Sequence, residues 1–432
     1  MVRGVFTKNS KKKGKSLSFV VTKQQNNKRL LPMSIKTLTL QILEKMSNIS
    51  KWQAIFLVTN FELQLQLRGR HNFLNMSRYG VYNESTYREN YGRDFDFKKF
   101  NVELIKMSCE DELTVAFDPS YISKSGKHTP GTGYFWSGCA GQNKWGLEIG
   151  GFAAIDIKNN TAMHLVANQT LSFQEHETLL NYYAALVCHH VETITQISKY
   201  VVVDAYFSRA PFTSVVCNLG LEVVTRLRND AYLQYPYLGP HPKRRGAKTK
   251  YAGKFDPRNL DPSYFTCCIE EDSFRIYEAT LYSKSLKRCL RIAVMHTYDE
   301  AGKIKSHKIY CSTDLALSGI DVYIYYKTRF QIEFLYRDSK GYTGLEDCQS
   351  RSESKLHFHF NTALTTVSLA KAIYHLNQPI EERTPFSMAD IKTLNFNELI
   401  VDLIFNECGI DPHNPIIIPI RKKLLNFGKI RA

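Results

Sequence analysis

Three acidic residues have the types and positions expected of a site that cleaves phosphodiesters: Asp118, Asp204 and Glu333. Asp118 follows the β-prone run 113–117, and Asp204 follows the continuous apolar run 200–203. Cleavage by two metal ions requires carboxylates that converge on metals about 4 Å apart, and Mg²⁺ prefers oxygen ligands. Two Asp at neighbouring strand ends and a Glu on a packed helix meet this requirement. Each Asp alone is weak support, because Asp also ends strands as a turn former.

A helix predicted over 323–340 carries Glu333 among cations. Five of its residues fall within about an 80° arc at 100° per residue: Tyr326, Arg329, Glu333, Arg337 and Lys340. One interpretation is a solvent-exposed face on which Glu333 pairs with Arg329 and Arg337. The other is a metal-binding carboxylate among cations that hold DNA phosphates. The spacing alone does not choose between them.

The charge of the chain favours a polyanionic partner. The net charge is +16, residues 1–30 carry nine Lys or Arg and no acid, and residues 243–254 carry six and no acid. Nucleic acid is the first candidate and an anionic membrane surface the second. A single charge run is usually only a solvated tail or loop, but two favour phosphate contact. The candidate contacts outside the 323–340 helix are Lys124, Lys127, Lys243, Arg244, Arg245 and Lys248.

Cysteine and histidine usage gives no metal signature. The ten Cys form no C-x-x-C pair, which is typical of free thiols in a reducing compartment. Cys188-His189-His190 and Cys267-Cys268 lack the spacing of a zinc site. His357 and His359 are expected to pack or hydrogen-bond. No apolar run of 18 residues exists, so we expect no transmembrane helix and a cytoplasmic protein.

The hydrophobic patterns predict an α/β protein of several domains. After a basic flexible arm at 1–30, helices at 34–47 and 51–66 indicate a helical DNA-binding domain at 31–108. Strand, strand, strand, helix, strand, helix and strand then follow over 109–228, with one long helix at 171–200. This is the order of an RNase H-like mixed sheet core. A β-rich insertion at 229–315, with strands at 273–296 and 303–313, precedes the second part of the core at 316–376. Two further helices are expected at 352–376 and 387–408, the second in a C-terminal helical region at 377–432.

The helix motif also resembles a family signature. Tyr326-x2-Arg329-x3-Glu333-x6-Lys340 is similar to the Y-R-E-K signature of the IS-four family of bacterial DDE transposases. The resemblance extends from about residue 70 to the C-terminus. Its other similar segments are 72–79, 117–121, 134–138, 203–207, 342–345 and 351–353.

The resemblance implies an activity and its partners. Asp118, Asp204 and Glu333 would be the catalytic residues and the ligands of two Mg²⁺ ions, with Mn²⁺ as an alternative. The enzyme would cut double-stranded DNA at terminal inverted repeats and join the 3′ ends to target DNA. Its expected form is a homodimer in a synaptic complex, in a bacterial cytoplasm and on the nucleoid when bound. Neither a membrane nor a small-molecule substrate is expected.

The resemblance also assigns DNA contacts. Tyr326, Arg329, Arg337 and Lys340 would contact the transposon end. Some relatives carry a Trp in the insertion that stacks on a flipped base. Here Trp52, Trp136 and Trp145 all lie outside it, and Tyr298 is a weak substitute, so a DNA hairpin step is in doubt.

Three alternatives remain open. The chain could be a catalytically silent DNA-binding relative, another RNase H-like nuclease that ignores terminal repeats, or a basic scaffold whose binding does not depend on Mg²⁺.

Overall fold

The computed structural model describes residues 33–171, 178–240 and 247–430. The expected arm at 1–30 and the candidate contacts Lys243, Arg244 and Arg245 lie outside these residues. No described helix is both long enough and apolar enough to cross a bilayer.

Short helices with polar caps open the described chain. The side chain before each helix accepts a hydrogen bond from the backbone N–H three residues further on, which satisfies a donor that the first helical turn leaves free. These caps are Ser34, Ser50, Asn72, Asn83 and Asp96. The helices are α1 (Ile35–Glu44), α2 (Lys51–Gln66), α3 (Phe73–Tyr79), α4 (Glu84–Asn90) and α5 (Phe97–Ser108). Their apolar sides join the same hydrophobic cluster as the sheet.

The sheet is mixed, as the α/β prediction requires, and has twelve strands. In its first part the strand order is β4-β3-β1-β5-β6, in which β3 runs antiparallel to both neighbours and β1, β5 and β6 are parallel. These strands are β1 (Leu113–Ser123), β3 (Gln142–Asp156), β4 (Thr161–Gln169), β5 (Tyr200–Val202) and β6 (Glu222–Leu227). A hairpin strand, β2 (Gly133–Ser137), pairs with the start of β3.

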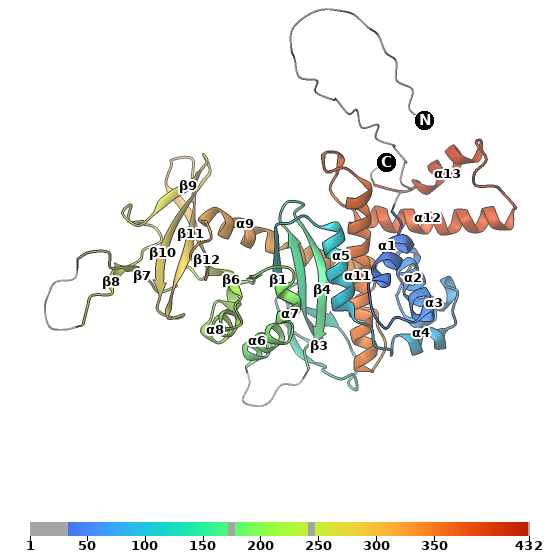
Figure 1. The fold of residues 1–432 in the computed structure, drawn as a ribbon, viewed down its shortest axis with the longest axis horizontal. Coiled ribbons are helices and arrows are strands. Elements are labelled where there is room, and N and C mark those ends of the chain that lie inside the picture. The colour runs from blue at the N-terminus through green and yellow to red at the C-terminus, as the bar shows by residue number, and fades with distance from the viewer. Residues whose placement is uncertain (1–32, 172–177, 241–246, 431–432) are drawn as a thin grey trace, which may run out of the picture. The chain divides into compact units, whose positions relative to one another are not determined.

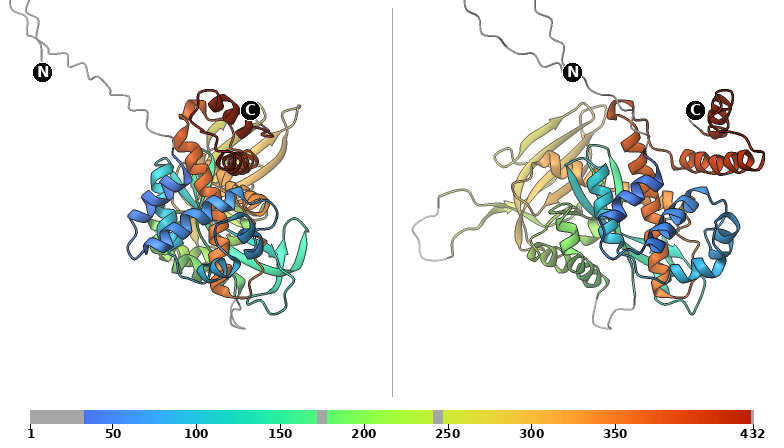
Figure 2. Two further views of the ribbon diagram at one scale, coloured as in Figure 1. Left: turned by 90° about the vertical axis from the view of Figure 1, so that its right-hand side faces the viewer. Right: turned by 45° about the vertical axis from the view of Figure 1, so that its right-hand side comes forward.

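Helices cover both faces of this part of the sheet. A Cβ at Gly150 would meet Leu186 of α6 (Leu179–His189), whereas one at Gly151 would meet Tyr336 on the opposite face. Phe117 and Phe152 fill the first face together with α6 and α8 (Ala210–Asn218). On the second face α5 and α11 (Glu353–Asn377) run beside β4 (Figures 1 and 2). α11 confirms the helix expected at 352–376.

Side chains of α11 and α5 occupy the outer edge of β4. The Asn361 amide donates to the carbonyl of Ala167 and accepts from its N–H, both at 2.9 Å. Further along the strand, Ser368 accepts from His164 N–H, Asn101 donates to Leu165, and Lys371 donates to Ala162. Side chains therefore take the place of a further strand at these backbone groups of the edge strand.

The single helix expected at 171–200 is wrong. The described part of this range holds α6 and α7 (Val191–Thr195), with the chain non-helical at His190. The imidazole of His190 bonds the side chain of Asn168 at 2.7 Å and packs on Phe152. These tertiary contacts hold the chain in its non-helical conformation at His190. Hydrophobic periodicity along the sequence does not reveal contacts of this kind.

The insertion is β-rich and has its own hydrophobic cluster. The run at 273–296, expected as one strand, is a hairpin of β10 (Phe274–Ser283) and β11 (Arg288–Tyr298). Its last strand, β12 (Ile304–Ser312), pairs with β6 and so continues the sheet. The remaining strands are β7 (Leu233–Pro236), β8 (Tyr251–Lys254) and β9 (Thr266–Glu270).

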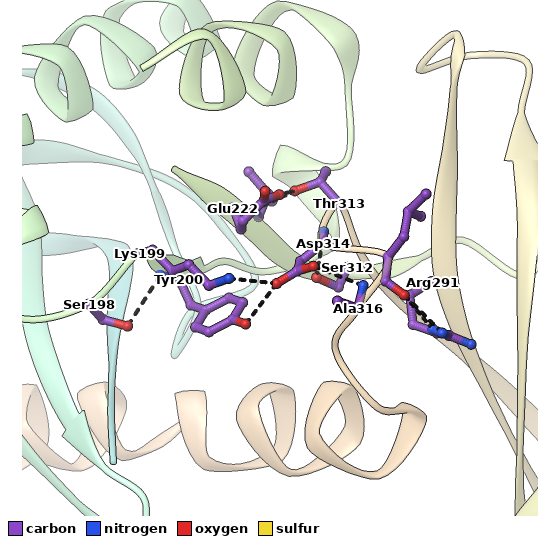
Figure 3. A network of polar contacts seen from close by, with 11 residues as sticks. Ser198, Lys199, Tyr200, Glu222, Arg291, Ser312, Thr313, Asp314 and Ala316 are labelled. Carbon is purple, nitrogen blue, oxygen red and sulfur yellow. Dashed lines mark hydrogen bonds and ion pairs between the residues drawn. The ribbon is translucent and has the colours of Figure 1, made fainter. Parts of the chain in front are cut away.

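A polar network fastens the return from the insertion to the core. Asp314 accepts hydrogen bonds from Lys199 Nζ and Tyr200 Oη, both at 2.8 Å, and from Ala316 N–H at 2.9 Å (Figure 3). Beside it, Thr313 Oγ1 donates to Glu222 and accepts from Val223 N–H. Residues 313–316, which lead into the helix that begins at Gly319, are thereby fixed against the starts of β5 and β6.

Two helices end the described chain. α12 (Met388–Glu407) confirms the helix expected at 387–408, and α13 (Ile417–Leu425) packs against it. Arg421 of α13 bridges Glu398 and Asp402 of α12.

Candidate active site

Asp118 and Asp204 both follow the short parallel pairing of β1 with β5, at the same end of it. β1 pairs with β5 only at Val115 and Ala116, after which β1 continues against β3 alone. The strand expected to end at Asp118 therefore runs on to Ser123. Asp204 follows β5, and its Oδ1 accepts from Tyr206 N–H at 2.9 Å. The two carboxylates are close enough for the charge of Asp204 to raise the pKa of Asp118, and Arg329 lowers the pKa of both.

The position of Asp118 is set by its neighbours. Tyr336 Oη donates to the Asp118 carbonyl at 2.6 Å. This approach needs the glycine opposite, because a Cβ at Gly151 would collide with the Tyr336 hydroxyl. Sequence reasoning missed both residues. The pair Gly150-Gly151 within an apolar strand was the available signal, since such glycines often mark a close approach.

The helix that carries the third acid is broken. α9 (Gly319–Arg329) ends and α10 (Gln331–Tyr342) begins at Phe330, so the continuous helix expected over 323–340 is wrong. α9 packs on β10, β11 and β12, whereas α10 packs on β1, β3 and β4. The two surfaces impose different directions on the chain, and the break follows from packing rather than from local sequence. Tyr326 therefore lies on a different helix from Glu333.

Arg329 nevertheless joins the acids. Its Nη2 donates to Glu333 Oε1 at 2.8 Å, and its Nη1 lies 3.5 Å from Asp118 Oδ1. The Asp118 side chain is 19% exposed, and that of Glu333 is 52% exposed. Arg329 itself is buried, and its Nε has no hydrogen-bond partner among the described residues. The positive charge of Arg329 thus offsets the negative charges of Asp118 and Glu333.

The electrostatics follow from burial and crowding. Burial raises the pKa of Asp118 to about 7, against the lowering effect of Arg329, and the charges of Asp204 and Glu333 raise it further. Burial also raises the pKa of Asp204, which Arg329 and the backbone N–H groups of Tyr206 and Phe207 partly offset. Buried like charges of this kind are typical of functional sites, although structural ion pairs produce them too.

The remaining residues of the motif surround this group. Tyr326 stacks against Tyr310 at 5.0 Å and lies under Arg329 at 5.9 Å. Arg337 is solvent-exposed and pairs with Asp338 at 3.0 Å. Lys340 Nζ donates to the Tyr121 carbonyl at 2.6 Å and pairs with Glu346 at 3.1 Å.

The predicted loop cations divide into two kinds. Lys124 Nζ donates to the carbonyls of Cys348 at 2.5 Å and Ser350 at 3.1 Å, so here it holds the segment before α11. Lys127 and Lys248 are exposed. His359 donates to the Gly344 carbonyl at 2.7 Å, which confirms the hydrogen-bonding role expected for it.

The donor chemistry of Asp118 and Asp204 suits a hard divalent cation. Both are oxygen donors, both are partly buried, and each carries a pKa raised by its surroundings, which a nearby cation would lower. Glu333 is instead held by Arg329. Within residues 33–171, 178–240 and 247–430, no three His, Cys, Asp or Glu side chains are arranged to hold one metal ion. Glu333 would have to leave its ion pair with Arg329 before it could bind a cation together with Asp118 and Asp204.

Comparison with known proteins adds little. No protein-family model matches the chain, and no curated protein matches it. Among solved structures, the chain is weakly similar to the cryo-EM structure of a piggyBac transposase synaptic complex with hairpin DNA. The TM-score is 0.40 at 10% identity, over 90% of this chain and 81% of that one. Similarity at this level establishes neither a shared fold nor a shared function.

Proposed function

We propose that this chain is a DNA transposase that cuts DNA and joins 3′ ends through Asp118, Asp204 and Glu333. The observation that carries the proposal is the convergence of two aspartates from adjacent parallel strands with a helical glutamate on one guanidinium, that of Arg329. The strand order β4-β3-β1-β5-β6 supports an RNase H-like core. The Y-R-E-K resemblance supports the narrower assignment to an IS-four family insertion sequence.

In the proposed reaction the chain positions groups on both sides of the scissile phosphate. Asp118 and Asp204, with Glu333 as third ligand, would hold two Mg²⁺ ions, or Mn²⁺. Such ions supply Lewis acidity and lower the pKa of a bound water. Tyr336 fixes the backbone of Asp118. Arg329 keeps the crowded carboxylates compatible until DNA and cations arrive, and then becomes available for a phosphate.

The proposed partner is double-stranded DNA, both terminal inverted repeats and target. Arg337 has an exposed guanidinium on the same helix as Glu333, and Lys127 and Lys248 are exposed. With a net charge of +16, phosphate contact would dominate affinity and make it salt-dependent. Pairing of two transposon ends would require a homodimer.

One observation favours a second candidate, the catalytically silent DNA-binding relative. The described residues contain no preassembled three-ligand metal site, and Glu333 is tied to Arg329. If that ion pair is permanent, the same surface binds DNA without cutting it.

A cleavage assay separates the two candidates. Labelled DNA that carries the flanking ends of the gene is incubated with Mg²⁺ or with EDTA. The wild type should cut at the repeat boundary only with Mg²⁺, and Asp204→Asn and Glu333→Gln should bind but not cut. Asp230→Asn is the matched control, because Asp230 forms an exposed pair with Arg228 away from the site. Binding without any cutting by the wild type would leave the silent relative.

A further inference from the structure

The β2–β3 hairpin carries three aromatic side chains that are exposed to solvent to different degrees. Tyr134 is 73% exposed, Trp136 60% and Trp145 38%, and two of the three tryptophans of the chain are among them. Tyr134 pairs across the hairpin with Trp145, and their rings meet edge to face at 5.5 Å. Trp136 lies two residues beyond Tyr134 and so on the same face of β2. We call these three side chains the aromatic face.

The register places the aromatic face on the Asp118 side of the sheet. Asp118 is opposite Gly151, and successive odd residues of β3 down to Trp145 share its face, with no bulge in the β1–β3 and β2–β3 pairings. The hairpin begins where β1 ends at Ser123. The six residue steps of β3 from Gly151 to Trp145 correspond to about 20 Å, or about six nucleotides of DNA at about 3.4 Å each.

The surroundings are cationic. From Pro119 to Leu147 the chain has no Asp or Glu, and it carries Lys124, Lys127 and Lys144. Lys127 and Lys144 are exposed. A polyanion that approaches the hairpin is therefore not repelled by any acidic residue of this segment. Exposed aromatic side chains beside cationic ones can stack on bases and bind phosphates at the same time.

The hairpin is fixed to the candidate active site. Tyr121 Oη donates to the Trp145 carbonyl at 2.7 Å, and the carbonyl of Tyr121 accepts from Lys340 of α10. The aromatic face therefore has a set position relative to the helix that carries Glu333, as a base-binding platform requires.

We propose that the aromatic face stacks on unpaired bases of the DNA strand that enters the Asp118 site. The inference rests on the proposed function and narrows its substrate to DNA that is unpaired or distorted a few nucleotides from the scissile phosphate. It also assigns base stacking to the core hairpin rather than to the insertion.

Tryptophan fluorescence tests the inference directly. Titration with an oligothymidylate is performed in EDTA, on a Trp52→Phe background in which only Trp136 and Trp145 report. Trp52 is the matched control, because it is 42% exposed on α2 and far along the chain from the hairpin. We expect quenching in this background and none in Trp136→Phe/Trp145→Phe, where only Trp52 remains.

Affinity gives a second measurement. Trp136→Ala and Tyr134→Ala should each weaken binding of single-stranded DNA by about 5- to 100-fold and leave duplex binding nearly unchanged. Trp136→Phe should retain most of the affinity, and Trp52→Ala all of it. Both alanine variants remove exposed rings, and gel filtration checks that they fold. Wild-type affinity in both alanine variants, or no quenching, overturns the inference.

The outcomes separate this inference from the proposed function. Quenching without Mg²⁺-dependent cleavage would support base stacking and contradict the proposed transposase activity. Cleavage without quenching would support the transposase activity and contradict only the base stacking. If Trp136→Ala instead converts a dimer to a monomer with unchanged DNA affinity, the aromatic face is an interface between copies and the inference fails.

Discussion

Arg329 and Glu333 form a 2.8 Å ion pair across a helix break at Phe330. The two residues lie on helices that pack against different strands of the same sheet, so the ion pair depends on how α9 and α10 are placed relative to each other. The same guanidinium lies 3.5 Å from Asp118. Its positive charge therefore lies between two acidic residues, where a bound cation would have the same effect.

We expect Arg329→Gln to destabilise the protein and to strengthen its response to Mg²⁺. Removal of the guanidinium leaves the partly buried Asp118 without its partner, at a cost of about 1–3 kcal/mol. Mg²⁺ would then no longer compete with an internal cation. The melting temperature of variant and wild type is measured with Mg²⁺ and with EDTA. An equal shift by Mg²⁺ in both proteins would show that Arg329 does not occupy the cation position.

Gly151→Ala should displace Tyr336 and weaken the site. The added Cβ collides with the Tyr336 hydroxyl that holds the Asp118 carbonyl, so we expect a loss of about 1–3 kcal/mol in stability and slower cleavage. Gly138→Ala is the control, since nothing lies within 4 Å of its Cβ. In a Tyr336→Phe background the cost of Gly151→Ala should shrink. A cost that is the same in both backgrounds contradicts the proposed contact.

Asp314→Ala should loosen the insertion. Asp314 accepts from Lys199, Tyr200 and Ala316, and loss of this buried acceptor costs about 1–3 kcal/mol. Limited proteolysis should then cut within 229–315 faster than in wild type. Asp230→Ala, which removes only an exposed pair, should not change the cleavage pattern. Equal protection of both variants would mean that pairing of β6 with β12 alone holds the insertion.

His164 should make the protein less stable in acid. Burial lowers its pKa from 6.5 to about 4, although the bond to Asn361 raises it. The folded state therefore binds fewer protons than the unfolded chain between these values. The contribution of His164 to the free energy of unfolding is complete above pH 6.5. This contribution falls by about 3 kcal/mol as the pH drops from 6.5 toward 4. Urea unfolding of wild type and His164→Gln at pH 7.5 and 4.5 checks this, and the variant should lose less stability.

The sequence predicted the parts of the site that depend on local pattern. The apolar run before Asp204 indicated a central strand, and the helical spacing around Glu333 indicated its helix. The break at Phe330 was invisible, because it arises where two helices pack on different strands. Likewise, Gly151 matters only through Tyr336, which is 185 positions away in the chain. The pairing of Lys124 with two backbone carbonyls depends on the segment before α11 and has no local signature.

The occupied edge of β4 has a consequence for how copies of the chain can meet. β4 is almost entirely buried and five of its nine residues are apolar, and an open strand of this kind is a template for β-aggregation. Because Asn361, Ser368, Asn101 and Lys371 already bond backbone groups of β4, a neighbouring molecule would have to displace these side chains to add a strand there. We therefore expect copies of the chain to meet through side-chain surfaces on this side of the molecule, and not through strand addition at β4.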